Sequence, residues 1–141
     1  MNKRIILGIL AMLSIMLLPA LGCREHPLIT SWRTEGLVEK GGFVSHSISA
    51  GGERYKALEV RARVPTGTLD DEVKCEAVES RLLADITIPE DVDLIVINIC
   101  ERTGPSFASS WKSRITTHRV AGRKKLSDEL MWQFFSGSKC P

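Results

Sequence analysis

Two stretches with different hydrophobic patterns predict neighbouring strands of one sheet. Around residues 55–64, apolar and charged residues alternate, so a strand there has one apolar and one charged face. Residues 94–97 are all aliphatic and do not alternate, which is typical of a short strand covered on both faces. We therefore expect the first strand to be half-buried and the second to be central. The apolar positions of the first strand are Leu58, Val60, Ala62 and Val64.

A helix is predicted between these strands, over residues 69–86. Pro65 and Gly67 end the first strand in a turn, and Thr68 with Asp71 provides capping groups for the helix. Apolar residues then recur at steps of three and four, which places them on one helical stripe. These residues are Cys75, Val78, Leu82 and Ile86.

Weaker patterns on both sides complete the fold. Residues 43–49 form a hairpin with the first strand, and residues 110–120 form one with the central strand. Ser127 can cap a last helix that carries an apolar arc of large side chains, which we expect to dock on the sheet. The arc consists of Leu130, Met131, Phe134 and Phe135.

The element order is therefore β-β-α-β-β-α. Strands joined through a helix run parallel, whereas hairpin strands run antiparallel. The order predicts an α+β fold with a mixed four-stranded sheet and helices packed on one face.

The amino terminus has the pattern of an export signal. Lys3 and Arg4 precede an apolar run over residues 5–18, which is shorter than a comfortable bilayer span. The sequence Leu21, Gly22, Cys23 follows, and it resembles the lipobox of bacterial lipoproteins, although the leucine of that motif usually stands one place earlier. The resemblance implies cleavage before Cys23 and attachment of lipid to its thiol.

Two alternatives to lipidation remain, namely ordinary cleavage after small residues with Cys23 left as a plain thiol, and an uncleaved anchor. With lipidation, the chain divides into a signal peptide (1–22), a tether and entry segment (23–41) and one small domain (42–141). The protein would then be held on the extracytoplasmic side of the cell membrane or outer membrane. With ordinary cleavage it would be periplasmic or secreted.

The cysteines of the domain suggest a disulfide, because an exported protein folds in an oxidising compartment. The crossover topology brings the start of the helix and the end of the central strand to one edge of the sheet, so we expect a bridge between Cys75 and Cys100. The alternative is that Cys75 is a buried apolar residue and that Cys100 pairs with Cys140.

The sequence contains no motif of a catalytic, metal or cofactor site. The cysteines lack the close spacing of zinc or redox sites, and none of the three histidines lies in a hydrolase or phosphate-loop motif. Ser45 and Ser47 flank His46 on a strand, so their side chains point to the opposite face and cannot form a nucleophile and base pair with it. We therefore expect no cofactor and no metal.

Charge is unevenly distributed along the chain. The formal net charge of +2 falls to zero once residues 1–22, with Lys3 and Arg4, are removed, which argues against nucleic-acid binding. Residues 59–101 contain 11 acids and 4 bases, whereas residues 102–125 contain 7 bases and no acid. We expect these charges to pair across the domain surface. The alternative is that Arg123, Lys124 and Lys125 contact lipid head groups.

Two classes of function are compatible with this sequence. A non-catalytic domain tethered to the membrane would bind a protein, a glycan or lipid in the cell envelope, and the export signal favours this class. A small envelope hydrolase with dispersed catalytic residues is the alternative, as is an inhibitor or immunity protein.

Overall fold

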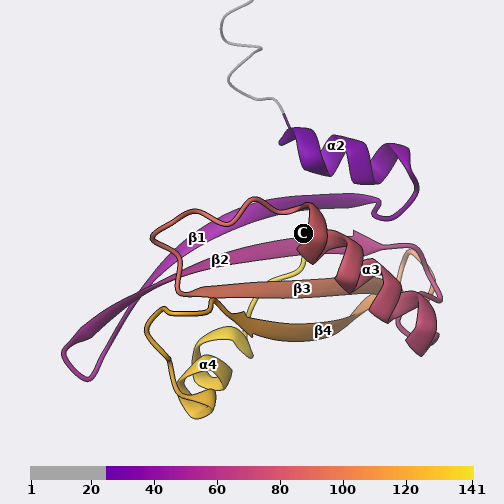
Figure 1. The fold of residues 1–141 in the computed structure, drawn as a ribbon. Coiled ribbons are helices and arrows are strands. Elements are labelled where there is room, and N and C mark those ends of the chain that lie inside the picture. Colours follow the sequence, from indigo (N-terminus) through magenta and orange to yellow (C-terminus); the bar gives the residue numbers. More distant parts are fainter. Residues whose placement is uncertain (1–24) are drawn as a thin grey trace, which may run out of the picture.

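A computed structural model describes residues 25–141, so the expected signal peptide and Cys23 lie outside the described residues. These residues form a four-stranded sheet with three helices (Figure 1). The elements are α2 (Pro27–Thr34), β1 (Lys40–Ala50), β2 (Glu53–Val64), α3 (Glu72–Asp85), β3 (Leu94–Thr103), β4 (Ser110–Arg119) and α4 (Asp128–Phe135).

The strands lie in the order β1-β2-β3-β4. β1 pairs antiparallel with β2, β2 pairs parallel with β3, and β3 pairs antiparallel with β4. The predicted α+β class, the mixed sheet and the succession of strands are thereby confirmed.

The sheet has an apolar cluster on each face. On one face, α2 and α3 cover alternate residues of β2 and β3, including Val60, Ile95 and Ile97. On the other face, α4 covers the intervening residues, including Ala57, Leu94 and Val96. β3 therefore contributes side chains to both apolar cores and is covered on both faces, as expected from its continuous aliphatic run.

The position of α4 differs from the prediction that all helices pack on one face. α4 buries Met131 and Phe135 against the face opposite α3. Its apolar arc is only half-buried, because Leu130 and Phe134 remain exposed. The structural reason is that both faces of β3 are apolar, so each face needs a cover.

α2 occupies part of the segment that we expected to be a tether. His26 caps the helix by accepting a hydrogen bond from the backbone N–H of Leu28, and Pro27 takes the first helical position. Ile29 and Trp32 are fully buried, and Trp32 Nε1 donates to Asp85 Oδ2 at 2.8 Å. Residues 27–34 therefore belong to the folded domain, and the Trp32 hydrogen bond joins α2 to the end of α3.

A glycine allows α2 to lie close to β1. A Cβ atom on Gly41 would stand 2.9 Å from the carbonyl oxygen of Arg61 and 3.0 Å from Cδ1 of Ile29. The first contact is with backbone, which cannot move easily. Only glycine therefore fits between the helix and β2 at this position.

Candidate functional site

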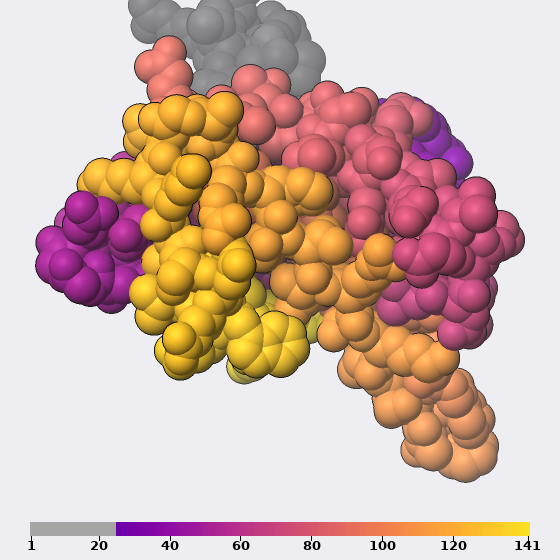
Figure 2. Space-filling view, turned by 60° about the horizontal axis from the view of Figure 1, so that its bottom comes forward, coloured from indigo at the N-terminus to yellow at the C-terminus, as the bar shows by residue number. Residues whose placement is uncertain are grey.

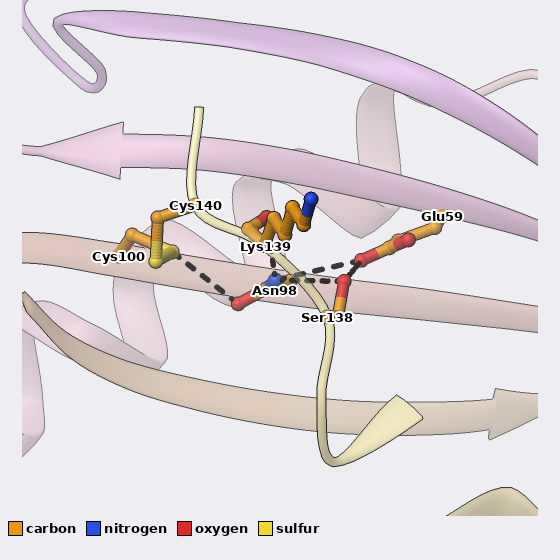
Figure 3. Close-up of a disulfide and its surroundings, with 6 residues drawn as sticks. All are labelled: Glu59, Asn98, Cys100, Ser138, Lys139 and Cys140. Carbon is orange, nitrogen blue, oxygen red and sulfur yellow. Dashed lines mark hydrogen bonds between the residues drawn. A yellow bond between two sulfur atoms is a disulfide. The ribbon is translucent and has the colours of Figure 1, made fainter. Parts of the chain in front are cut away.

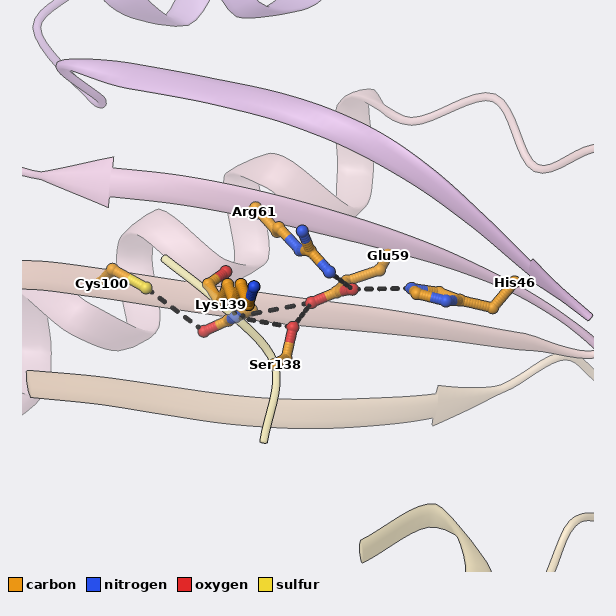
Figure 4. A network of polar contacts seen from close by, with 7 residues as sticks. His46, Glu59, Arg61, Cys100, Ser138 and Lys139 are labelled. Carbon is orange, nitrogen blue, oxygen red and sulfur yellow. Dashed lines mark hydrogen bonds and ion pairs between the residues drawn. The ribbon is translucent and has the colours of Figure 1, made fainter. Parts of the chain in front are cut away.

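A cluster of buried and half-buried polar groups lies on the α4 face of the sheet, centred on Glu59 (Figure 4). We refer to it as the Glu59 cluster, and it comprises His46, Glu59, Arg61, Asn98 and Ser138. Glu59 is on the charged face of β2, which we expected to be the more exposed face, yet its side chain is 0% exposed. α4 and the segment after it cover this face instead.

Four side chains donate hydrogen bonds to the Glu59 carboxylate or pair with it. His46 Nε2 lies 2.7 Å and Arg61 Nη2 3.0 Å from Oε1. Asn98 Nδ2 lies 3.4 Å from Oε2, and the Ser138 hydroxyl also donates to Oε2. The acceptor capacity of the carboxylate is therefore used within the protein.

The pKa of Glu59 lies below its ordinary value. Burial by itself would raise this pKa, since it penalises the charged form. Hydrogen bonds from Arg61, Ser138 and His46 favour the carboxylate and outweigh the effect of burial. Glu59 is therefore a stable anion inside the fold, which makes it a poor general base at neutral pH.

His46 connects the cluster to α4. Its ring meets the rings of Phe134 and Phe135 edge-on, with centroids 5.4 and 5.3 Å apart. A groove of about 410 Å³ opens beside the ring, between β1, β2 and the end of α4. The groove is lined by His46, Glu59, Arg61, Gln133, Phe134, Phe135, Ser136, Gly137, Ser138 and Lys139.

The C-terminal segment is fixed across this face by the same cluster and by a disulfide (Figure 3). Asn98 Nδ2 lies 3.2 Å from the Ser138 hydroxyl and 3.5 Å from the Lys139 carbonyl oxygen. Cys140, two residues after Ser138, forms a disulfide with Cys100, and the Cα atoms of the two cysteines lie 5.7 Å apart. Three groups on the sheet, Glu59, Asn98 and Cys100, therefore hold this segment.

The expected bridge between Cys75 and Cys100 is wrong, and the alternative pairing with Cys140 is present. Cys75 is on α3, which covers one face of the sheet, whereas Cys100 follows Ile99 on β3 and so points to the other face. The start of α3 follows β2 and the end of β3 lies at the same edge of the sheet, but the sulfur atoms of Cys75 and Cys100 are on opposite faces. Cys75 is a buried free thiol, and burial raises its pKa although Arg114 partly opposes this effect.

The geometry of the Glu59 cluster does not form a nucleophile and base pair. A serine nucleophile must donate its proton to a base such as histidine. Here the Ser138 hydroxyl and His46 both face Glu59, on different carboxylate oxygens, and the hydroxyl donates to the carboxylate. This arrangement fixes the tail on the sheet and orients His46.

Four of the seven bases in residues 102–125 pair with acids across the surface, in line with the expectation. Each pair joins a base of β4 or of the following loop to an acid elsewhere in the domain. The pairs are Lys112–Asp70 at 3.0 Å, Arg114–Glu72 at 2.8 Å, Arg114–Glu79 at 3.1 Å, Arg119–Asp128 at 2.6 Å and Arg123–Asp93 at 3.1 Å.

Of the three bases considered for lipid contact, Arg123 has structural partners. Its guanidinium pairs with Asp93 and also donates to the carbonyl oxygen of Asp91 at 3.1 Å. Lys124 reaches the carbonyl oxygen of Arg54 at 3.4 Å, and Lys125 is exposed. Lys124 and Lys125 are therefore the bases of this loop that remain available to an external anion.

Sequence reasoning missed Asn98 and Ser138. Asn98 is the one polar residue between Leu94 and Cys100, and such a residue in a buried strand needs hydrogen-bond partners. That requirement was a usable signal, but the sequence did not identify the partner. Ser138 is one of many serines, and only the path of the C-terminal segment brings it to Glu59.

Within residues 25–141, the structure contains no group of three or more His, Cys, Asp and Glu side chains that could hold a metal ion. No helix in the same range is long and apolar enough to cross a membrane. Comparisons of the chain with protein-family models, with curated proteins and with solved structures found no match.

Proposed function

We propose that this protein is a lipid-anchored lipoprotein of the bacterial cell envelope with a non-catalytic binding or structural role. The observation that carries the anchor is the succession of a basic start, a short apolar run and Gly22 before Cys23. The helix α2 begins at Pro27, four residues after Cys23. At about 3.5 Å per residue, the link between lipid and domain would be at most roughly 14 Å long. Such a tether would hold the domain next to the bilayer.

Support for a non-catalytic role comes from the Glu59 cluster. Its carboxylate is saturated by donors of the protein itself, and its serine faces the carboxylate and not the histidine. A catalytic site would need a group with free capacity toward substrate. The cluster instead fixes the C-terminal segment, which is a structural role.

Mass spectrometry of the protein recovered from membranes tests the anchor. We expect a mature chain that begins at Cys23, with a mass increase that corresponds to a diacylglyceryl group. The matched control is Cys23→Ala, which removes the thiol and should release the protein from washed membranes or leave its signal uncut. A mature chain with a free thiol at Cys23, or one that retains Met1, would overturn the proposal.

The binding role has its own test. If Lys124 and Lys125 contact anionic lipid, the chain without residues 1–23 binds phosphatidylglycerol vesicles at low salt and loses binding in Lys124→Ala/Lys125→Ala. Lys112→Ala is the control, because Lys112 is a surface base already paired with Asp70. Equal binding by the parent chain, by Lys124→Ala/Lys125→Ala and by Lys112→Ala would assign the lipid contact to another surface.

A further inference from the structure

β4 is an edge strand that lacks the usual protection against pairing. Natural edges are blunted by proline, by bulges or by free charges. β4 contains no proline, and its register with β3 continues without a bulge from Ser110 to Arg119. Its three charged bases, Lys112, Arg114 and Arg119, are all paired with acids of the same domain. The outer edge of β4 is therefore open to another strand.

Large apolar side chains are exposed next to this edge, and we refer to them as the aromatic surface. Figure 2 shows α4 beside β4, with the β3–β4 hairpin projecting from the body of the molecule. Phe107 near the hairpin tip is 90% exposed and Trp132 on α4 is 70% exposed. The aromatic surface consists of Phe107, Trp111 and Trp132.

A groove of about 160 Å³ lies between β4 and α4 on the same face. Ile115 and Thr117 line it from β4, and Met131, Trp132 and Phe135 line it from α4. Exposed apolar groups that gather beside an open strand edge are typical of a protein interface. The occupant must therefore offer both a strand and apolar side chains.

We propose that the occupant is a second copy of this chain, whose β4 pairs antiparallel with β4 about a twofold axis at Ile115. The two sheets then form one continuous sheet of eight strands. Because the axis is perpendicular to the sheet, both α4 helices lie on the same face, and the two Ile115 side chains meet beside the two grooves. This inference does not depend on lipid attachment.

The sequence of β4 is self-complementary in this register. Arg114 faces Thr116 and Lys112 faces His118, so neither Lys nor Arg faces another Lys or Arg across the seam. Trp111 faces Arg119, a pairing that favours stacking of a guanidinium on an aromatic ring. Moving the axis by one residue to Arg114 would place two guanidinium groups opposite each other, which is unfavourable. Charge is therefore compatible with a centre at Ile115 and disfavours one at Arg114.

Ser113 and Thr117 provide a test that is specific to this register. Both side chains are exposed, and in the dimer Ser113 of one copy faces Thr117 of the other. Ser113→Lys/Thr117→Lys would place Lys opposite Lys twice, whereas Ser113→Glu/Thr117→Lys would place Glu opposite Lys twice. Both variants change the same two exposed positions of β4, so they are matched for their effect on the monomer.

The full chain, purified in a density-matched detergent, is measured by sedimentation equilibrium. We expect a dimer for the wild-type chain, a dissociation constant at least tenfold higher for the Lys/Lys variant, and a dimer as tight as wild type or tighter for the Glu/Lys variant. Trp132→Ala should also weaken the dimer, whereas Val73→Ala, at an exposed valine on α3, should not. Circular dichroism confirms that each variant is folded.

Two results would overturn the proposal. One is a wild-type chain that remains monomeric up to millimolar concentration. The other is a dimer that the Lys/Lys and Glu/Lys variants change equally, because its interface would then lie elsewhere or in another register.

Discussion

At the scale of single residues, Glu59 is a buried charge whose removal should cost a large part of the stability of the fold. Removing one partner of a buried, hydrogen-bonded ion pair costs about 3–5 kcal/mol, because the other charge is left without compensation. We expect Glu59→Gln to lower the free energy of unfolding by this amount at pH 7, since Arg61 and His46 lose the carboxylate. Denaturant unfolding measures the difference.

The pH dependence of that difference has a defined sign. The pKa of Glu59 is lowered in the folded state, so its ionisation stabilises the fold above the ordinary glutamate pKa. This contribution is lost as the pH falls through the folded pKa. The gap between wild type and Glu59→Gln should therefore shrink below about pH 4. Glu90→Gln, at an exposed carboxylate, is the control, and a gap that is constant from pH 7 to 3 would contradict the argument.

The residue scale also shows where sequence reasoning stops. The alternation of β2 identified Glu59 as a residue of the charged face, but not that this face is covered. Cys100 was correctly predicted to lie near the end of the central strand. Its disulfide partner, however, depends on the face of the sheet to which its side chain points. Strand periodicity assigns residues to two faces without saying which element covers each one. The disulfide prediction failed for that reason.

At the scale of elements, the C-terminal segment is held by a disulfide that closes a loop of 40 residues. In the chain-entropy model, such a loop contributes roughly 4 kcal/mol to stability. We expect Cys100→Ala/Cys140→Ala to lose about this amount in denaturant unfolding, and wild-type protein unfolded under reducing conditions should match the variant. A loss below about 1 kcal/mol would mean that the hydrogen bonds of Asn98 and Ser138 suffice to hold the segment.

α4 allows a comparison between two adjacent phenylalanines. Phe135 is 2% exposed in the core beneath the helix, whereas Phe134 is 43% exposed beside His46. Phe135→Ala should cost about 3–5 kcal/mol, and Phe134→Ala about 1 kcal/mol, because only the first leaves a cavity. Thermal and denaturant unfolding give both values. Equal losses would indicate that α4 is rotated about its axis relative to the structure.

The sequence predicted most elements but not α2. Periodicity and capping residues marked α3, although its N-cap is Asp71, three residues after the expected cap Thr68, and the helix begins at Glu72. α2 has only eight residues, and its cap is His26, which is not a usual N-cap residue. Its stability comes from burying Ile29 and Trp32 against the sheet, which is a tertiary effect that local patterns do not show.

At the scale of the whole molecule, the sheet separates two apolar clusters that share β3. Ile95, Ile97 and Ile99 belong to the cluster under α2 and α3, and Leu94 and Val96 belong to the cluster under α4. The apolar run of β3 was the sequence signal for this arrangement, because a strand covered on both faces needs two covers. The prediction that every helix packs on one face is wrong, because a strand that is apolar on both faces needs a covering element on each.

Because β3 belongs to both cores, we expect the domain to unfold as one cooperative unit. Leu82→Ala empties the core under α3 and Phe135→Ala the core under α4, and each should cost roughly 2–5 kcal/mol. In both variants the exchange rate of the β3 amide protons should rise by the same factor as the equilibrium constant for global unfolding. This should hold although the two side chains lie on opposite faces of the sheet. Val73→Ala, at an exposed site on α3, should leave exchange unchanged. If Phe135→Ala accelerated exchange in α4 alone, α4 would be an independently opening unit, and the two faces of the sheet would not be energetically coupled.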